Sequence, residues 1–110
     1  MLVITQSETY KWPVKVLVAA DGGRFDESKF TAVFKRLTQS RIQEISSAED
    51  MTDKVLAVEV LQGWEGVQDA DGNDVPFNTG NRDKLFDLPS VATTIVMAFM
   101  ESLAGAKRKN

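Results

Sequence analysis

The sequence of 110 residues contains no cysteine and no histidine. Without cysteine the chain can form neither a disulfide nor a thiolate metal site. Without histidine it lacks the side chain that titrates near neutral pH. With both absent, no Ser–His or Cys–His nucleophile and no ordinary zinc site can be built. We therefore expect a protein that is not an enzyme and that binds neither a metal nor a cofactor.

Long apolar runs are missing as well. The longest apolar stretch, 91–100, is interrupted by two threonines and is about half as long as the ~20 residues that span a bilayer. The first twelve residues include Gln6, Glu8 and Lys11, where a secretory signal would be continuously apolar. These features predict a cytoplasmic protein with no membrane partner, in which 91–100 forms a buried helix.

The chain also lacks an excess of positive charge. Its 13 Lys and Arg residues against 16 Asp and Glu give a formal net charge of -3. This balance argues against a nucleic-acid partner, because affinity for phosphates needs a basic surface. The hydrophobic fraction of 43% is ordinary for a globular protein. We predict a single domain over 1–110, with short disordered ends at about 1–10 and 106–110.

The first third of the chain predicts two strands. Residues 13–20 place three valines at alternate positions on one face, the pattern of a half-buried strand. The other face becomes apolar towards its end, which predicts partial cover on both sides. Asp21-Gly22-Gly23 suits a tight reversal, and a second strand is expected over 28–37. The two strands should form an antiparallel hairpin.

Helical patterns follow the second strand. Thr38 can cap a first short helix, and Ser47 with Asp50 resembles a capping box for a second helix. The buried stripe of the second helix is expected at Val55, Leu56, Val58, Val60 and Leu61. Several of these residues are β-branched, so a partly strand-like conformation stays open as an alternative.

The last forty residues predict two further helices. The segment 63–67 breaks the second helix, and a third short helix should open at Thr79 or Asn81. Pro89 suits the first turn of a fourth helix, and Gly105 should end it. The sequence therefore predicts the α+β class: an N-terminal antiparallel β-hairpin followed by a bundle of about four short helices.

Acidic residues gather at 69–74, and alternating acidic loops can bind calcium through their oxygen atoms. The EF-hand loop, however, needs a glycine at its sixth position and a glutamate at its twelfth. Counted from Asp69, Gly72 is at the fourth position and Gly80 is at the twelfth. A solvated turn is the better interpretation.

Three other candidate sites have simple structural explanations. Glu65 beside Trp64 could be a carboxylate of raised pKa, but no second carboxylate is suggested at a fixed spacing. Residues 21–24 are glycine-rich but lack the spacing of a phosphate-binding loop. The basic residues 107–109 suit the negative end of the last helix dipole.

The last predicted helix has two interpretations. Met97 and Met100, with Phe99 and Leu103, would suit an adaptable surface for a partner helix, because methionine repacks easily. The same residues would also serve as core packing for the hairpin. Both interpretations can hold for different residues.

Short motifs occur in a fixed order in the second half of the chain: Leu61-Gln62-Gly63-Trp64-Glu65-Gly66-Val67, Asp69-Ala70-Asp71-Gly72 and Val75-Pro76-Phe77. In this order they resemble the tail-assembly chaperones of long-tailed phages, in which a GW-x-GV segment precedes an acidic turn and a PF pair. A short helix and a proline-started helix then follow. The N-terminal half also fits, through its Asp-Gly-Gly turn and the F-x-A-x-F-x-R-L pattern of Phe30–Leu37. The resemblance covers about 13–110.

The resemblance implies a non-catalytic chaperone that binds the tape-measure protein and keeps it soluble until the tail-tube protein polymerises around it. The tape-measure protein is the expected partner, the tail-tube protein is a second candidate, and a homo-oligomer is compatible with both. Such a chaperone acts in the host cytoplasm and is absent from the mature virion. The alternative is a structural minor tail component, such as a tube, completion or connector protein.

A chaperone of this kind must cover apolar stripes reversibly, with many copies of a modest apolar surface. The candidate partner-binding residues lie around the acidic turn and on the last helix: Trp64, Val67, Phe77, Met97, Met100 and Leu103.

Overall fold

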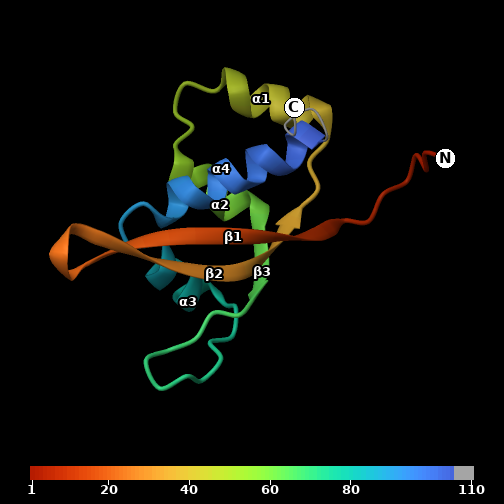
Figure 1. The fold of residues 1–110 in the computed structure, drawn as a ribbon. Coiled ribbons are helices and arrows are strands. Elements are labelled where there is room, and N and C mark those ends of the chain that lie inside the picture. The colour runs from red at the N-terminus through yellow and green to blue at the C-terminus, as the bar shows by residue number, and fades with distance from the viewer. Residues whose placement is uncertain (106–110) are drawn as a thin grey trace.

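A computed structural model describes residues 1–105 (Figure 1). The elements are β1 (Thr9–Ala20), the short 3₁₀ turn η1 (Asp21–Gly23), β2 (Arg24–Lys35), α1 (Gln39–Ser47), α2 (Asp53–Val60), β3 (Leu61–Glu65), α3 (Thr79–Phe86) and α4 (Val91–Ala104). This order confirms the α+β class, with an antiparallel hairpin first and four helices after it. The predicted basic tail and the predicted disordered end at 106–110 lie outside the described residues.

The hairpin is longer than the sequence pattern predicts. β1 and β2 pair over their whole lengths, from Thr9 opposite Lys35 to Ala20 opposite Arg24. The strand order is β1-β2-β3, so β1 is an edge strand. Pro13 is tolerated inside β1 because an edge strand does not need every N–H for the ladder. β1 therefore starts at Thr9, four residues before the proline that seemed to open it.

β3 corrects the prediction that 63–67 only breaks a helix. This strand pairs antiparallel with β2, from Glu65 opposite Thr31 to Leu61 opposite Phe34, with a register shift between Val33 and Phe34. Gly63 permits the close approach, since a Cβ atom there would lie 3.5 Å from the Val33 side chain. The glycine that looked like a breaker therefore marks the contact of two strands.

The core lies on one face of the sheet and is covered by helices. Phe34 is fully buried, with its ring edge-on to Phe99 of α4 at a centroid distance of 5.4 Å and to Tyr10 at 6.0 Å. The Tyr10 hydroxyl lies 2.6 Å from the Ser102 hydroxyl and joins β1 to the end of α4. The other buried residues are Val14, Val16, Phe30, Ala32, Leu56, Ala57, Val60, Leu61, Phe86, Val91, Ile95 and Phe99.

The opposite face of the hairpin is open, so the prediction of partial cover on both faces is wrong. Cross-strand pairs on this face are charged, with Lys11 2.6 Å from Glu65 and Lys15 3.7 Å from Glu27. Exposed pairs of this kind add little stability. Leu17 lies opposite Glu27 on this face and is exposed. Val18 on the inner face is exposed as well, because the hairpin extends beyond the helices that cover that face (Figure 1).

The caps of the first two helices are partly as predicted. Thr38 caps α1 through its hydroxyl, which confirms that start. The second N-cap is Thr52, whose hydroxyl accepts from the backbone N–H of Val55 at 3.2 Å. The capping box at Ser47 and Asp50 is therefore wrong, because Ser47 is still the last residue of α1. Val55 is exposed, and the buried residues of α2 are Leu56, Ala57 and Val60.

Of the last two helices, α3 begins at a predicted residue and α4 begins after the predicted one. Asn78 caps α3, so the helix opens at Thr79 as one of the two predictions had it. Pro89 precedes α4 instead of lying in its first turn, because Ser90 is the N-cap and has a left-handed φ of 68°. Gly105 ends α4 with a positive φ of 61°, as predicted.

Helix α1 has no fully buried residue and is held to α2 by an ion pair. The Arg41 Nε donates to Glu59 Oε2 at 2.7 Å, and Nη2 donates to Oε1 at 2.5 Å. This bidentate geometry fixes direction as well as distance. The hydrogen bonds from Arg41 hold the pKa of the Glu59 carboxyl below its ordinary value.

We expect α1 to loosen from α2 in acid. Because the pKa of Glu59 is lowered in the folded protein, the ion pair contributes fully above the ordinary carboxyl pKa of 4.5 and is lost as the pH falls through the folded pKa. The variant Glu59→Gln should show the loosened helix at every pH. The measurement is the NMR Cα chemical shifts of α1, with those of α4 as the internal control. If neither acid nor the substitution changed the chemical shifts of α1, the ion pair would not be what holds α1 to α2.

Candidate functional site

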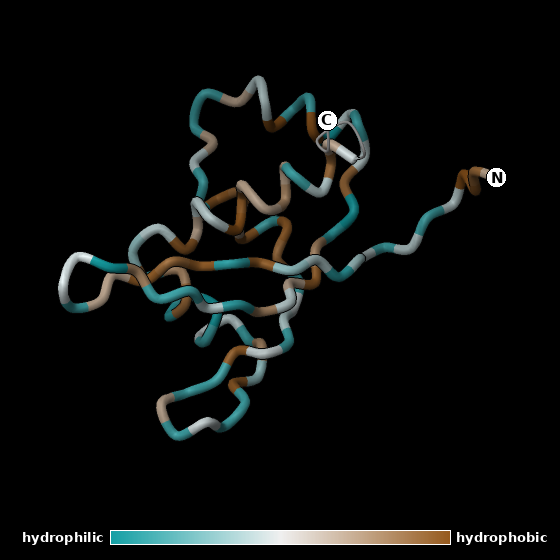
Figure 2. The backbone as a smooth tube through the Cα atoms, in the orientation of Figure 1, coloured by the Kyte–Doolittle hydropathy of each residue, from teal (hydrophilic) through white to brown (hydrophobic). Residues whose placement is uncertain are grey.

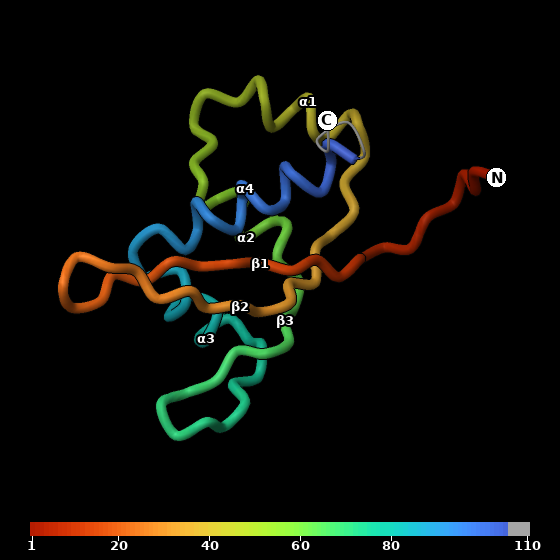
Figure 3. The backbone as a smooth tube through the Cα atoms, viewed as in Figure 1, coloured from red at the N-terminus to blue at the C-terminus, as the bar shows by residue number. Residues whose placement is uncertain are grey.

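The six predicted partner-binding residues come from two parts of the fold. Trp64, Val67 and Phe77 lie at the end of β3 and around the loop that follows it; we call them the Trp64 cluster. Met97, Met100 and Leu103 lie on the outer side of α4; we call them the α4 ridge. In the chain trace of Figure 3, β3 and the loop after it run away from α4.

The residues of the Trp64 cluster are half-buried, and a ring contact and hydrogen bonds connect this part of the chain. The Trp64 ring meets the Phe77 ring edge-on, at a centroid distance of 4.9 Å and an angle of 81°. The Trp64 Nε1 donates to the carbonyl oxygen of Val75 at 2.7 Å, and the N–H of Val75 donates to the carbonyl of Val67 at 2.8 Å. These contacts close the base of the acidic loop and hold it against the sheet.

The acidic loop at 69–74 is the solvated turn that the sequence predicts. One oxygen of the Asp69 carboxylate accepts from the backbone N–H groups of Asp71 and Asn73, at 2.9 and 3.0 Å. Gly72 supplies the positive φ of the turn. Across residues 1–105, no group of three or more acidic side chains is placed to hold a metal ion.

The α4 ridge is the exposed half of a helix whose other half is core. Val91, Ile95 and Phe99 are buried, whereas the ridge residues are 41–65% exposed. Residues three positions apart are neighbours on a helix surface, so the three ridge side chains form one continuous strip. The core interpretation of α4 therefore holds for the buried residues, Phe99 included, while partner binding by the exposed ridge residues stays a prediction.

Helix α4, which carries the ridge, is too short by itself to pass as a membrane span. Among the described residues, no single helix combines the length and the apolar character needed to cross a membrane. By length and composition only α3 and α4 taken together pass, as a pair bent by 99° at their junction.

A third apolar area lies under the free half of the hairpin, and sequence reasoning missed it. This hairpin groove has a volume of about 680 Å³ and runs between the hairpin and the junction of α3 with α4. Its apolar lining includes Val16, Val18, Phe30, Val67, Leu88 and Val91. Val67 is the one predicted site residue that lines it. No local pattern could reveal the groove, because four separate segments build it.

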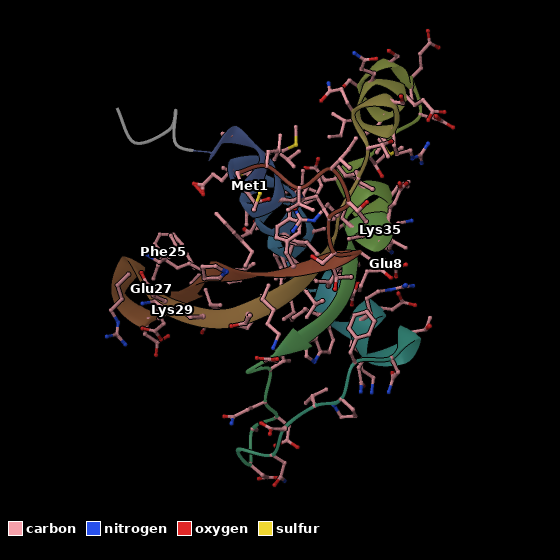
Figure 4. The ribbon with its side chains drawn as sticks, turned by 90° about the vertical axis from the view of Figure 1, so that its right-hand side faces the viewer. Met1, Glu8, Phe25, Glu27, Lys29 and Lys35 are labelled. Atoms are coloured by element: carbon pink, nitrogen blue, oxygen red, sulfur yellow. The ribbon has the colours of Figure 1, made fainter. Side chains whose placement is uncertain are left out.

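The chemistry of these surfaces is apolar contact. No polar or charged residue is buried among residues 1–105, and no buried side-chain nitrogen or oxygen there lacks a hydrogen-bond partner. Lys29 is the one charged residue in the lining of the hairpin groove. Figure 4 shows Glu27 and Lys29 with Phe25 at the free end of the hairpin, far from Glu8 and Lys35 at its other end.

The fold and its surfaces define a small α+β protein with a helix-covered sheet and three uncovered apolar areas. A family model described as YdaY prophage protein matches residues 25–108, which is most of the chain. The chain therefore belongs to the YdaY prophage protein family, and the phage origin predicted from the sequence is confirmed. No match was found among curated proteins or among solved structures.

Proposed function

We propose that this prophage protein is a tail-assembly chaperone that binds the tape-measure protein and keeps it soluble during tail morphogenesis, without catalysis. The observation that carries the proposal is the α4 ridge, a strip of large apolar side chains on the outer side of a 14-residue core helix. Membership of a prophage family places such a strip in a phage context.

The ridge suits a helical partner for two reasons. Methionine is unbranched and adapts its shape, so Met97 and Met100 can pack against differing apolar stripes along a long partner. The ridge also lies on a helix, and an amphipathic partner helix can pack against it with its own apolar face. One ridge offers little area, so affinity would come from many copies bound side by side along the tape-measure protein.

The Trp64 cluster has a supporting role in this proposal. Its internal hydrogen bond and ring contact explain most of its burial, and the exposed edges of Trp64 and Phe77 give a second, smaller contact area. The tail-tube protein is the second candidate partner. The proposed place of action is the host cytoplasm, and the finished virion should lack the protein.

Co-expression with the tape-measure protein of the same phage tests the function. We expect the wild-type protein to keep the tape-measure protein in the soluble fraction. The triple variant Met97→Asp/Met100→Asp/Leu103→Asp should lower the yield of soluble tape-measure protein at least about tenfold, since every 1.4 kcal/mol of lost contact is tenfold in affinity. Val55→Asp is the matched control, because Val55 is as exposed as Met100 but lies on α2. A triple variant as effective as the wild type would refute the ridge as the binding surface.

The alternative function is a structural minor tail component. The observation in its favour is the free end of the hairpin, where Phe25 and Leu17 are exposed and could pack in an assembled tail. Mass spectrometry of purified virions separates the two functions. A structural component is retained in virions at fixed stoichiometry, whereas a chaperone is found only in infected cells.

A further inference from the structure

The first four residues form an apolar segment that nothing in the described chain covers. Met1, Leu2, Val3 and Ile4 are each at least 56% exposed, and residues 1–7 carry no charged side chain. We call Met1–Ile4 the arm. Figure 2 shows it as a hydrophobic stretch that projects from the body. Four consecutive exposed apolar side chains are costly in water, so the arm needs a surface to cover it.

The hairpin groove offers an apolar lining beside an open strand edge. β3 pairs with β2 only at residues 31–34, so residues 25–30 of β2 have β1 as their only strand neighbour within the described chain. The chain turns away from β2 at Gly66, whose φ is 85° and whose Cβ position would lie 3.7 Å from Phe30 Cα. An extended segment laid there would find apolar side chains and backbone groups free to pair.

The arm does not lie in the groove of its own chain, and all four of its side chains are exposed. Along β1, Leu17 lies eight steps from Thr9, or about 26 Å at the rise of a strand. Met1 is also eight steps from Thr9, so only a fully extended segment folded straight back along β1 would reach this part of the groove. Figure 1 shows the arm and the free end of the hairpin at opposite ends of the molecule.

We propose that the arm of one copy docks in the hairpin groove of a second copy. The arm and the groove are different surfaces, so the contact is head-to-tail and leaves one arm and one groove free at the two ends of each complex. Successive copies would then form an open chain. If the proposed chaperone function holds, such a chain would present a row of α4 ridges to one long partner; the self-association itself does not depend on that function.

Sedimentation velocity on the purified full chain, without any partner, tests the docking. We expect the wild-type mass to rise beyond a dimer as concentration increases. The arm variant Leu2→Asp/Ile4→Asp and the groove variant Val18→Asp/Leu88→Asp should each remain monomeric alone. An equal mixture of the two should form dimers only, because one intact arm then meets one intact groove. Val55→Asp should associate like the wild type.

Two results would overturn the proposal: a wild type that is monomeric at every concentration, or an arm variant that assembles as the wild type does. The arm variant touches no core residue, so it remains informative even if the groove variant fails to fold. Added to wild-type chains, the arm variant should also shorten them by capping their free arms. A failure to solubilise the tape-measure protein would leave these results unchanged, so the two proposals fail separately.

Discussion

Replacing Phe34 by alanine is expected to remove about 3–5 kcal/mol from the free energy of unfolding, the usual cost of deleting a large buried aromatic side chain. Phe34 is fully buried and meets both Phe99 and Tyr10 edge-on, so its removal separates the sheet from α4. The free energy of unfolding of a small domain is about 5–15 kcal/mol in total, so the variant should be close to unfolding at room temperature. Urea unfolding followed by circular dichroism gives the difference.

Phe25→Ala is the matched control for Phe34→Ala. Phe25 is on the same strand but is 65% exposed, so its replacement should change the free energy of unfolding by no more than about 0.5 kcal/mol. The comparison also tests the register of the hairpin. A slip by one residue would exchange the two faces of β2, and the exposed and buried phenylalanines would then show the opposite order of effects.

Trp64→Ala is expected to lower the free energy of unfolding by about 3 kcal/mol. This is the low end of the range for large aromatic residues, because Trp64 is only half-buried. The variant loses the edge-on contact with Phe77 and leaves the Val75 carbonyl without its indole donor. Trp64→Phe keeps a ring but loses the hydrogen bond, and should cost about 1 kcal/mol.

These two variants show whether Trp64 has a structural role or a partner-binding role. Unfolding measurements report on the structural role, and limited proteolysis of the acidic loop reports whether its base has opened. If Trp64→Ala left the free energy of unfolding unchanged but reduced the yield of soluble tape-measure protein, Trp64 would be a contact residue and its structural role here would be wrong.

The parts of the fold with local signals could be predicted from the sequence. The alternating valines of β1 and the Asp21-Gly22-Gly23 turn fix the hairpin, because alternation and positive φ are properties of neighbouring residues. Thr38 and Gly105 mark helix ends for the same reason. The α4 ridge was also predictable, since the 3.6-residue period of the helix places Met97 and Met100 together.

The parts decided by distant contacts could not be predicted. Gly63 looks like a helix breaker until the neighbouring strand at Val33 is known. Ser90 takes a left-handed φ that its sequence does not favour, and this moved the start of α4 past Pro89. The hairpin groove depends on how far β1 and β2 extend beyond the helices, a length set by packing and not by the strands themselves.

The Tyr10–Ser102 hydrogen bond joins residues 92 positions apart, which has a consequence for the chain during its own synthesis. Ribosomes add about 5–20 residues per second, so β1 and β2 emerge several seconds before α4 exists to cover them. During that interval the aromatic face of Tyr10 and Phe34 is in contact with water or with another protein. The nascent hairpin therefore exposes an apolar surface that the cell's own folding factors could bind until α4 covers it.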